Sequence, residues 1–355
     1  MTAYFLVYAW IVATSALLYI KKIEYQKAKK WFCALSFLAV FLLFALRHPF
    51  MGTDLRYGNG IGYLGVYVRG AGASWKEILE QEHLYYFERG YTFFTKLISY
   101  ISDDQQFFLA ACAVLSIAPV GYTVYKESSE PDLSLYIFMG LPVFVLLFSG
   151  VRQGIAIGIC VLALLWVIRK KPVAFLLTVL VAMSFHKTAI LFLVAYPVYY
   201  FKMNKVLRWI TFAVPPAVYF LRYELFALVG RFSESYAVPD YNNSYRLFAI
   251  FYLIYLFCCI FSAEDQGTAG LKNLFLAACC IQALGGAHSI VMRAGYYFVT
   301  SLTLLLPRVL RSMGNRKLAA LFKAGICICF IAFGLYSLRS EIWTRAYPYY
   351  AFWEW

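Results

Sequence analysis

Charged residues are scarce in this sequence. Lysine, arginine, aspartate and glutamate together make up 14% of the 355 residues, whereas 63% are hydrophobic. A soluble domain of this length does not have enough interior to bury that much apolar surface. The composition therefore excludes a soluble globular protein and indicates an integral membrane protein, for which the lipid acts as the apolar solvent.

Polar segments contain no cysteine. The two adjacent pairs, Cys258-Cys259 and Cys279-Cys280, have neither the spacing of a metal site nor a histidine beside them. We therefore predict no structural disulfides, no metal centre and no cofactor. All nine cysteines lie in apolar runs, at Cys33, Cys112, Cys160, Cys258, Cys259, Cys279, Cys280, Cys327 and Cys329.

The sequence also lacks a basic stripe, although its formal net charge is +14. Its lysines and arginines occur in short clusters between apolar runs, and a nucleic-acid site needs a continuous basic face. Nucleic acid is therefore excluded as a partner, and we interpret the clusters as signals of membrane topology.

Apolar runs of membrane-spanning character fill most of the chain. A span needs about 17–25 largely uncharged residues, and all of its backbone hydrogen bonds must be satisfied internally, which favours helices. We predict an all-α, polytopic membrane protein in which residues 1–355 form a single domain with about twelve transmembrane helices. The expected spans are 4–20, 31–46, 106–125, 133–149, 151–168, 172–185, 188–201, 207–223, 246–262, 271–287, 294–310 and 318–337.

The distribution of basic residues predicts the orientation. No positive residue precedes the first span, and a dense cluster beginning at Lys21-Lys22 follows it. A cleaved signal peptide has the opposite polarity, so this span is a retained helix. With the cluster inside, the short inner segments carry eighteen lysines and arginines and the outer ones eight. The positive-inside rule therefore places both chain termini outside.

A long outer segment, residues 47–105, follows the second span. Ser74 and Glu77 have the spacing of a capping box, which predicts a short helix as far as about His83. Residues 84–100 are too polar to span a membrane but strongly aromatic, which is typical of a helix lying in the membrane interface.

The remaining unusual polar residues fall on the outer side of this topology. All four histidines are among them. These outer residues are Arg47, His48, Asp54, His83, Glu88, Arg152, Gln153, His186, Lys187, His288 and Arg293.

Four of these residues are candidates for chemistry. Arg152 is either an arginine that extends to the interface or a cation that binds phosphate in a forked, bidentate manner. His186, at an abrupt break between two apolar runs, is either a hydrogen-bonded helix end or a general base. Asp54 and Glu88 are the two carboxylates that could also take an acid or base role.

Five short motifs together resemble the EpsG family of Wzy-like polysaccharide polymerases. They occur in family order over residues 47–298, and Thr188 stands where that family usually has serine. The motifs are Arg47 with Gly52-Thr53-Asp54 and Tyr57; Glu88-x-Gly90-Tyr91; Arg152-Gln153; His186-Lys187-Thr188-Ala189; and Arg293-x-x-Tyr296-Tyr297.

The resemblance implies a multi-pass enzyme of the bacterial inner (cytoplasmic) membrane with a site facing the outside. Such an enzyme joins polyprenyl-diphosphate-linked oligosaccharide units into a surface polysaccharide: O-antigen, capsule or exopolysaccharide. Its partners would be membrane lipid, and a flippase and a chain-length regulator of the same pathway. His186, Asp54 and Glu88 would be the catalytic candidates. The diphosphate and glycan would contact Arg47, Arg152, Gln153, Lys187, Arg293, Tyr296 and Tyr297.

Two other functions remain open at this stage. A flippase or transporter for lipid-linked oligosaccharides would place ionisable residues near the middle of the membrane on broken helices. A membrane acyltransferase would need a site reachable from cytosolic acyl donors, whereas His186 is predicted on the opposite side.

Overall fold

The computed structural model describes residues 1–55, 62–80, 87–230, 245–262, 265–340 and 344–354. Over these ranges the regular secondary structure is helical and contains no strand, which confirms the predicted all-α class. The chain divides into two compact units, and each is described by itself below. The single domain expected from the sequence stays a prediction.

The first unit consists of residues 1–190 together with 324–355. Its helices α1, α2, α6, α9 and α10 pack in that order, each against the next. The elements of this unit are α1 (Thr2–Ser15), η1 (Ala16–Tyr19), α2 (Tyr25–Ala45), α3 (Tyr63–Gly72), α4 (Trp75–Glu80), α5 (Arg89–Ser99), α6 (Gln105–Glu127), α7 (Pro131–Gly140), α8 (Pro142–Leu146), α9 (Val151–Ile168) and α10 (Pro172–Phe185).

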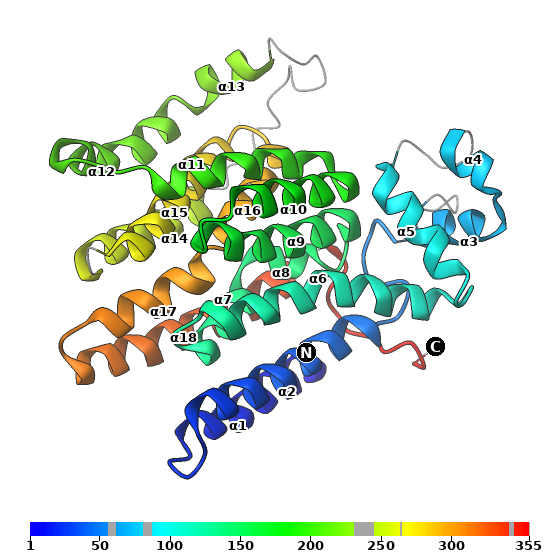
Figure 1. Ribbon diagram of the computed structural model, residues 1–355, viewed down its shortest axis with the longest axis horizontal. Coiled ribbons are helices and arrows are strands. Elements are labelled where there is room, and N and C mark those ends of the chain that lie inside the picture. The colour runs from blue at the N-terminus through cyan, green and yellow to red at the C-terminus, as the bar shows by residue number, and fades with distance from the viewer. Residues whose placement is uncertain (56–61, 81–86, 231–244, 263–264, 341–343, 355) are drawn as a thin grey trace. The chain divides into compact units, whose positions relative to one another are not determined.

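Three short helices of the outer segment gather at one end of α6, α9 and α10 (Figure 1). Two of them, α3 and α5, share a core with α6 and α9, in which the rings of Tyr67 and Phe108 stack with centroids 4.2 Å apart. The predicted capping box is confirmed, because the Glu77 N–H donates to Ser74 Oγ and the Ser74 N–H donates to Glu77 Oε2. The helix it begins ends at Glu80, and His83 lies outside the described residues.

The C-terminal tail of the first unit returns to the end of α2. The His48 N–H donates to the carbonyl of Tyr350, and the Phe352 N–H donates to the carbonyl of Leu46. Arg47 and Ala351 form an isolated antiparallel bridge between these hydrogen bonds. The tail therefore fixes the backbone where the outer segment begins.

The second unit consists of residues 191–323. α15 is its central helix and packs against α11, α12, α14, α16 and α17. The elements here are η2 (Lys187–Val194), α11 (Ala195–Tyr200), α12 (Lys205–Phe220), α13 (Arg222–Gly230), α14 (Tyr245–Phe261), α15 (Gln266–Leu284), α16 (Ser289–Val299), α17 (Leu302–Ser312) and α18 (Arg316–Ser340), of which η2 and α18 contribute residues to both units.

Fewer helices reach membrane-spanning length than the sequence suggests. Within the described residues, six are long and apolar enough to cross a bilayer, and a seventh is possible if α16 and α17, bent by 44°, count as one span. The multi-pass character is thus supported, whereas the tally of about twelve is not confirmed. The six are α1 with η1, α2, α6, α9, α15 and α18.

Several expected spans are interrupted helices. The predicted span 133–149 is divided at Leu141, which is extended (φ −75°, ψ 147°) because the ring of Pro142 disfavours the helical conformation in the preceding residue. The predicted span 188–201 starts as the 3-10 helix η2 and becomes α-helical only from Ala195. Hydropathy alone does not report such breaks.

Large apolar side chains face outward from the spans. On α1, Phe5 and Leu6 are 55% and 65% exposed, and on α10, Val173 and Leu177 are 69% and 57% exposed. In water such surfaces would be costly, whereas in lipid they are the expected exterior.

Candidate functional site

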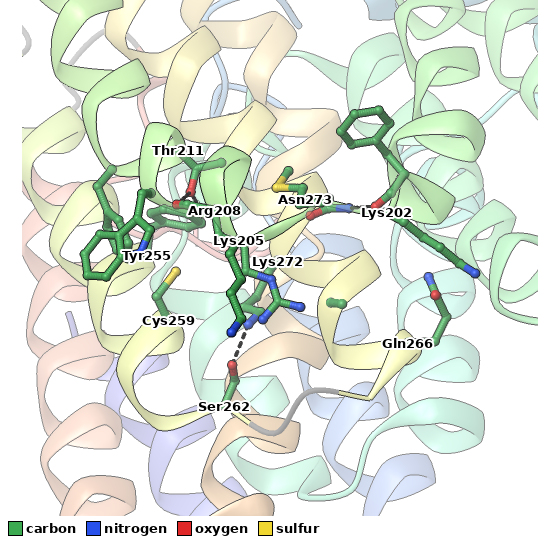
Figure 2. Close-up of a pocket in the computed structure, with 15 residues that line it drawn as sticks. Lys202, Lys205, Arg208, Thr211, Tyr255, Cys259, Ser262, Gln266, Lys272 and Asn273 are labelled. Atoms are coloured by element: carbon green, nitrogen blue, oxygen red, sulfur yellow. Dashed lines mark hydrogen bonds between the residues drawn. The ribbon is translucent and has the colours of Figure 1, made fainter.

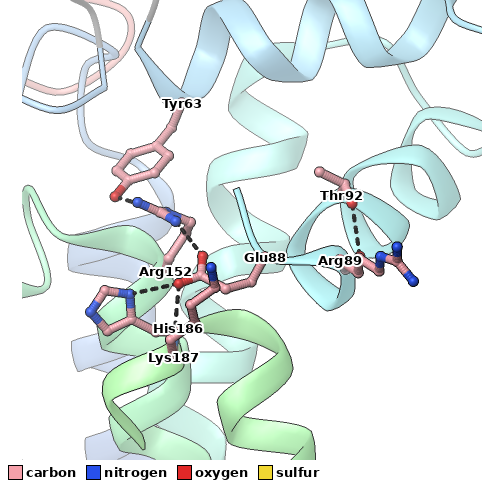
Figure 3. Close-up of polar contacts among 7 residues, drawn as sticks. All are labelled: Tyr63, Glu88, Arg89, Thr92, Arg152, His186 and Lys187. Atoms are coloured by element: carbon pink, nitrogen blue, oxygen red, sulfur yellow. Dashed lines mark hydrogen bonds and ion pairs between the residues drawn. The ribbon is translucent and has the colours of Figure 1, made fainter. Parts of the chain in front are cut away.

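The carboxylate of Glu88 is the centre of a polar cluster in the first unit (Figure 3). Its Oε2 forms an ion pair with Arg152 Nη1. Its Oε1 accepts a hydrogen bond of 3.0 Å from the Lys187 backbone N–H and lies 3.4 Å from His186 Nδ1. Three segments far apart in the sequence therefore meet at one buried carboxylate, which is 8% exposed.

The guanidinium of Arg152 has two further partners. Its Nε donates to the Tyr63 hydroxyl at 3.3 Å, and its Cζ lies 4.1 Å from the centroid of the Phe87 ring. A guanidinium stacked on a ring and paired with a carboxylate is held in one orientation. These contacts use Nε and Nη1 and leave Nη2 for another partner.

A break in the helix places His186 and Lys187 at this carboxylate. α10 ends at Phe185, and His186 is extended (φ −154°, ψ 115°), although its N–H still donates to the carbonyl of Ala182. Lys187 begins η2, so its N–H has no partner one turn earlier. Glu88 supplies the acceptor, and the helix break is thereby held by a side chain from the outer segment.

Glu88 itself lies immediately before α5, where Gly90 allows a close approach to α10. A Cβ at Gly90 would lie 2.1 Å from Ser184 Oγ and 2.8 Å from the Ser184 carbonyl oxygen. The serine side chain could rotate, but the backbone oxygen could not move without shifting the end of α10. The glycine in the motif Glu88-x-Gly90 is therefore a steric requirement of this site.

We expect Gly90→Ala to displace Glu88 from its partners. Inserting a methyl group into a tightly packed contact costs about 1–3 kcal/mol, so the thermal unfolding midpoint should fall. The matched control is Gly72→Ala at the end of α3, where an added Cβ meets no atom within 4 Å. Equal midpoints for the two variants would contradict the close-packing argument.

The electrostatic surroundings keep Glu88 ionised. Burial opposes its ionisation, but the contact with His186, the Lys187 N–H and the charge of Arg152 together lower the pKa of Glu88 to about 2. Burial also raises the pKa of the Tyr63 hydroxyl, which stays protonated. At neutral pH the cluster thus contains a carboxylate that is a weak base.

The shift predicts a pH dependence of stability. A carboxylate whose pKa is lowered in the folded protein stabilises the folded state at pH values above its ordinary pKa of 4.5. This contribution disappears as the pH falls through about 2. The expected size of this contribution is about 3 kcal/mol. The thermal unfolding midpoint of the wild type should be higher than that of Glu88→Gln at pH 6. This difference should stay constant down to about pH 5 and shrink towards pH 3. An advantage that is the same at pH 3 and pH 6 would exclude this linkage.

Asp54 lies next to the cluster, at its Tyr63 side. The Tyr63 N–H donates to the Asp54 carbonyl at 3.0 Å, and the Asp54 N–H donates to Ser149 Oγ at 3.2 Å. The negative charge of Asp54 also acts on the Tyr63 hydroxyl. Gly52 begins this turn with φ +105°, a left-handed conformation that L side chains rarely adopt.

Arg47 is buried beneath this turn and is 3% exposed. Its Nη1 donates to the carbonyls of Leu147 and Phe148 at 3.1 and 3.0 Å, just after α8. Burial lowers the pKa of Arg47 to about 10, so the group stays charged at neutral pH. The described contacts of Arg47 are those of a residue that joins backbone segments.

The remaining predicted site residues are divided between the two units. Gln153 is buried in the first turn of α9, and the side chain of Lys187 is exposed although its N–H reaches Glu88. In the second unit, Arg293 is half-buried on α16, where Tyr296 and Tyr297 are buried. Tyr57, part of the first motif, lies outside the described residues.

Two residues of the cluster are not indicated by the sequence pattern. Tyr63 is one of 30 tyrosines in the chain, and nothing in its spacing distinguishes it. Phe87 precedes Glu88 directly, and this proximity is the signal that could have been used. Among the described residues, no group of three His, Cys, Asp or Glu side chains has the arrangement of a metal site.

A model of the EpsG family matches residues 30–351 of the chain. The chain belongs to the EpsG family. The match includes every residue of the Glu88 cluster and extends well beyond the motifs on which the resemblance was based. No curated protein and no solved structure matched the chain. Membership of the EpsG family indicates a polysaccharide polymerase-like role.

Proposed function

We propose that this EpsG-family protein polymerises oligosaccharide repeat units carried on polyprenyl diphosphate. The product is a surface polysaccharide, and the reaction takes place at the outer leaflet of the bacterial inner membrane. The observation that carries the proposal is the meeting of Glu88, Arg152 and His186, which belong to three separate family motifs, at one buried site.

The reaction sets clear requirements for such a site. The hydroxyl of an acceptor unit attacks the anomeric carbon of the growing chain, and a new glycosidic C–O bond forms. The bond between that carbon and the lipid diphosphate breaks, and the bonding electrons leave with the diphosphate. The site must therefore accept one proton and stabilise negative charge on the leaving group.

His186 is suited to accept the proton. Its Nδ1 lies 3.4 Å from Glu88 Oε1, and we assign the hydrogen to this nitrogen, which leaves Nε2 to accept the proton. A carboxylate that orients an imidazole in this way also stabilises the imidazolium that forms. Glu88, with its pKa lowered to about 2, is a poor base, and we assign it to positioning.

Arg152 is suited to stabilise the leaving diphosphate. Glu88, Tyr63 and Phe87 hold its guanidinium in place, and Nη2 is available to a phosphate oxygen. The Tyr63 hydroxyl, whose hydrogen is not needed by Arg152 Nε, can donate to the same phosphate.

The remaining predicted residues have secondary roles in this proposal. Asp54 and Arg47 fix the turn that leads to Tyr63. Lys187 adds positive charge for the diphosphate and Gln153 contacts the glycan, whereas the diphosphate and glycan contacts expected for Arg293, Tyr296 and Tyr297 stay predictions. A flippase delivers the units, and a chain-length regulator acts on the product.

Cells from which the gene for this chain has been deleted provide the test. They should carry single repeat units on the lipid and no polymer, and the wild-type chain should restore the polymer ladder. Units that remain unpolymerised on the cytoplasmic leaflet would instead indicate a flippase. A normal ladder with altered acylation of the glycan would indicate an acyltransferase.

A further inference from the structure

The second unit contains a pocket of about 710 Å³ that shares no residue with the Glu88 cluster. A pocket of this size can hold a small ligand or the headgroup of a lipid. It lies between the loop that follows α11, the first turns of α12, the end of α14 and the start of α15 (Figure 2).

Four basic side chains line this pocket: Lys202, Lys205, Arg208 and Lys272. The charged ends of Lys205, Arg208 and Lys272 converge near Ser262, and Lys202 extends towards the side where Gln266 lies (Figure 2). The lining residues among those described include no carboxylate. The N-terminus of α12, where Asn204 caps the Leu207 N–H at 2.8 Å, adds the positive end of a helix dipole.

Aromatic side chains form another part of the wall. Phe201, Trp209, Phe212 and Tyr255 all line the pocket. Trp209 is 75% exposed, as expected for a ring at a membrane interface rather than in a protein core. Basic side chains together with aromatic rings suit an amphiphile with an anionic head.

Hydrogen bonds between helices hold the pocket in shape. Asn273 Nδ2 donates to the carbonyls of Val198 and Phe201, at 3.0 and 2.8 Å, and so fixes the loop after α11 against α15. The Tyr255 hydroxyl bonds to Thr211 Oγ1 at 2.8 Å and joins α14 to α12. Lys272 Nζ donates to Ser262 Oγ at 2.7 Å and joins α15 to the end of α14.

The two basic segments of the pocket have the same predicted location. Residues 202–208 and Lys272 both fall in inner segments by the distribution of basic residues. The structure brings these segments together in one pocket, as common exposure to the cytoplasmic side requires. Basic pockets between helices on that side are typical binding sites for anionic lipid headgroups.

We infer that this pocket binds the phosphate of an anionic lipid of the cytoplasmic leaflet. Lys205, Arg208 and Lys272 contact the phosphate, and the acyl chains lie along the aromatic wall. This site is separate from the proposed polymerase reaction and would exist whether or not that proposal holds.

Native mass spectrometry of the full chain in neutral detergent tests the inference. With phosphatidylglycerol added, the wild type should retain bound lipid, and with phosphatidylcholine it should retain much less. The variant Lys205→Gln/Arg208→Gln/Lys272→Gln should retain at least about tenfold less phosphatidylglycerol than the wild type, since each basic residue contributes separately to the binding of the anionic lipid. The charge-preserving variant Lys205→Arg/Arg208→Lys/Lys272→Arg should keep it, which separates loss of charge from loss of fold.

The matched control removes three charges from another predicted inner segment. Arg311→Gln/Arg316→Gln/Lys317→Gln alters exposed residues that do not line the pocket, and it should bind phosphatidylglycerol like the wild type. An equal loss in this control would overturn the inference, because the binding would then depend on net charge alone. Displacement of the lipid by inorganic phosphate would also overturn it, by showing that a soluble anion is the ligand.

Discussion

Purified His186→Gln should be folded, normally abundant and almost inactive in chain extension. Glutamine keeps a hydrogen-bonding group near Glu88 but cannot accept a proton at neutral pH. Loss of a positioned general base lowers the rate by about 10²–10⁴-fold, whereas loss of a helix-end hydrogen bond costs mainly stability, about 1–3 kcal/mol. Single-turnover extension of a lipid-linked unit would measure the rate, and thermal unfolding would measure the stability.

A second histidine provides the control for this substitution. His48 Nδ1 accepts a hydrogen bond from the Phe50 N–H at 3.2 Å, which is a local structural contact. His48→Gln should therefore extend chains at close to the wild-type rate. Wild-type turnover by His186→Gln would remove His186 as the base and move that role to Asp54.

Arg152→Lys should lower chain extension by about 10²–10³-fold at normal protein levels. Lysine keeps the charge but cannot contact Glu88, Tyr63 and a phosphate oxygen at the same time. The matched control is Arg89→Lys, since Arg89 is exposed and points away from the cluster (Figure 3). Full activity of Arg152→Lys would contradict the phosphate contact and would indicate that Arg152 only extends to the membrane interface.

A double-mutant cycle separates the structural and the chemical roles of the ion pair. Glu88→Gln and Arg152→Gln each leave one buried charge without its partner, which costs about 3 kcal/mol. The double variant should lose about 1–3 kcal/mol less unfolding free energy than the sum of the losses in the two single variants. Chain extension should be lost in all three. Recovery of activity together with stability would show that the pair serves only the fold.

The sequence predicts the helical class of this fold, whereas its expected tally of about twelve spans is not confirmed. Apolar runs such as 151–168 and 172–185 coincide with α9 and α10, because long uncharged segments must close their backbone hydrogen bonds within a helix. Local conformation around residues such as Pro142 divides other runs, and an average over hydropathy does not detect it. Among the described residues, length and composition then give six or seven candidate spans.

For the candidate site, the sequence indicates several of the residues but not the contacts between them. Glu88, Arg152 and His186 stand out in the sequence because polar residues at the ends of apolar runs are unusual. That Glu88 joins the other two could not be predicted, since it depends on how α3 and α5 pack on α6 and α9. Tyr63 was missed for the same reason, as its hydroxyl matters only through its place beside Arg152.

The central claim is that this protein itself joins lipid-linked repeat units, and the reaction of the purified protein tests it most directly. The wild type, incubated with a polyprenyl-diphosphate-linked repeat unit, should give a ladder of longer lipid-linked products and release one polyprenyl diphosphate for each bond formed. Arg89→Lys should give the same ladder, and His186→Gln should leave the single unit unchanged. A folded wild-type protein that moves the unit across a vesicle membrane without extending it, and releases no polyprenyl diphosphate, would contradict the account.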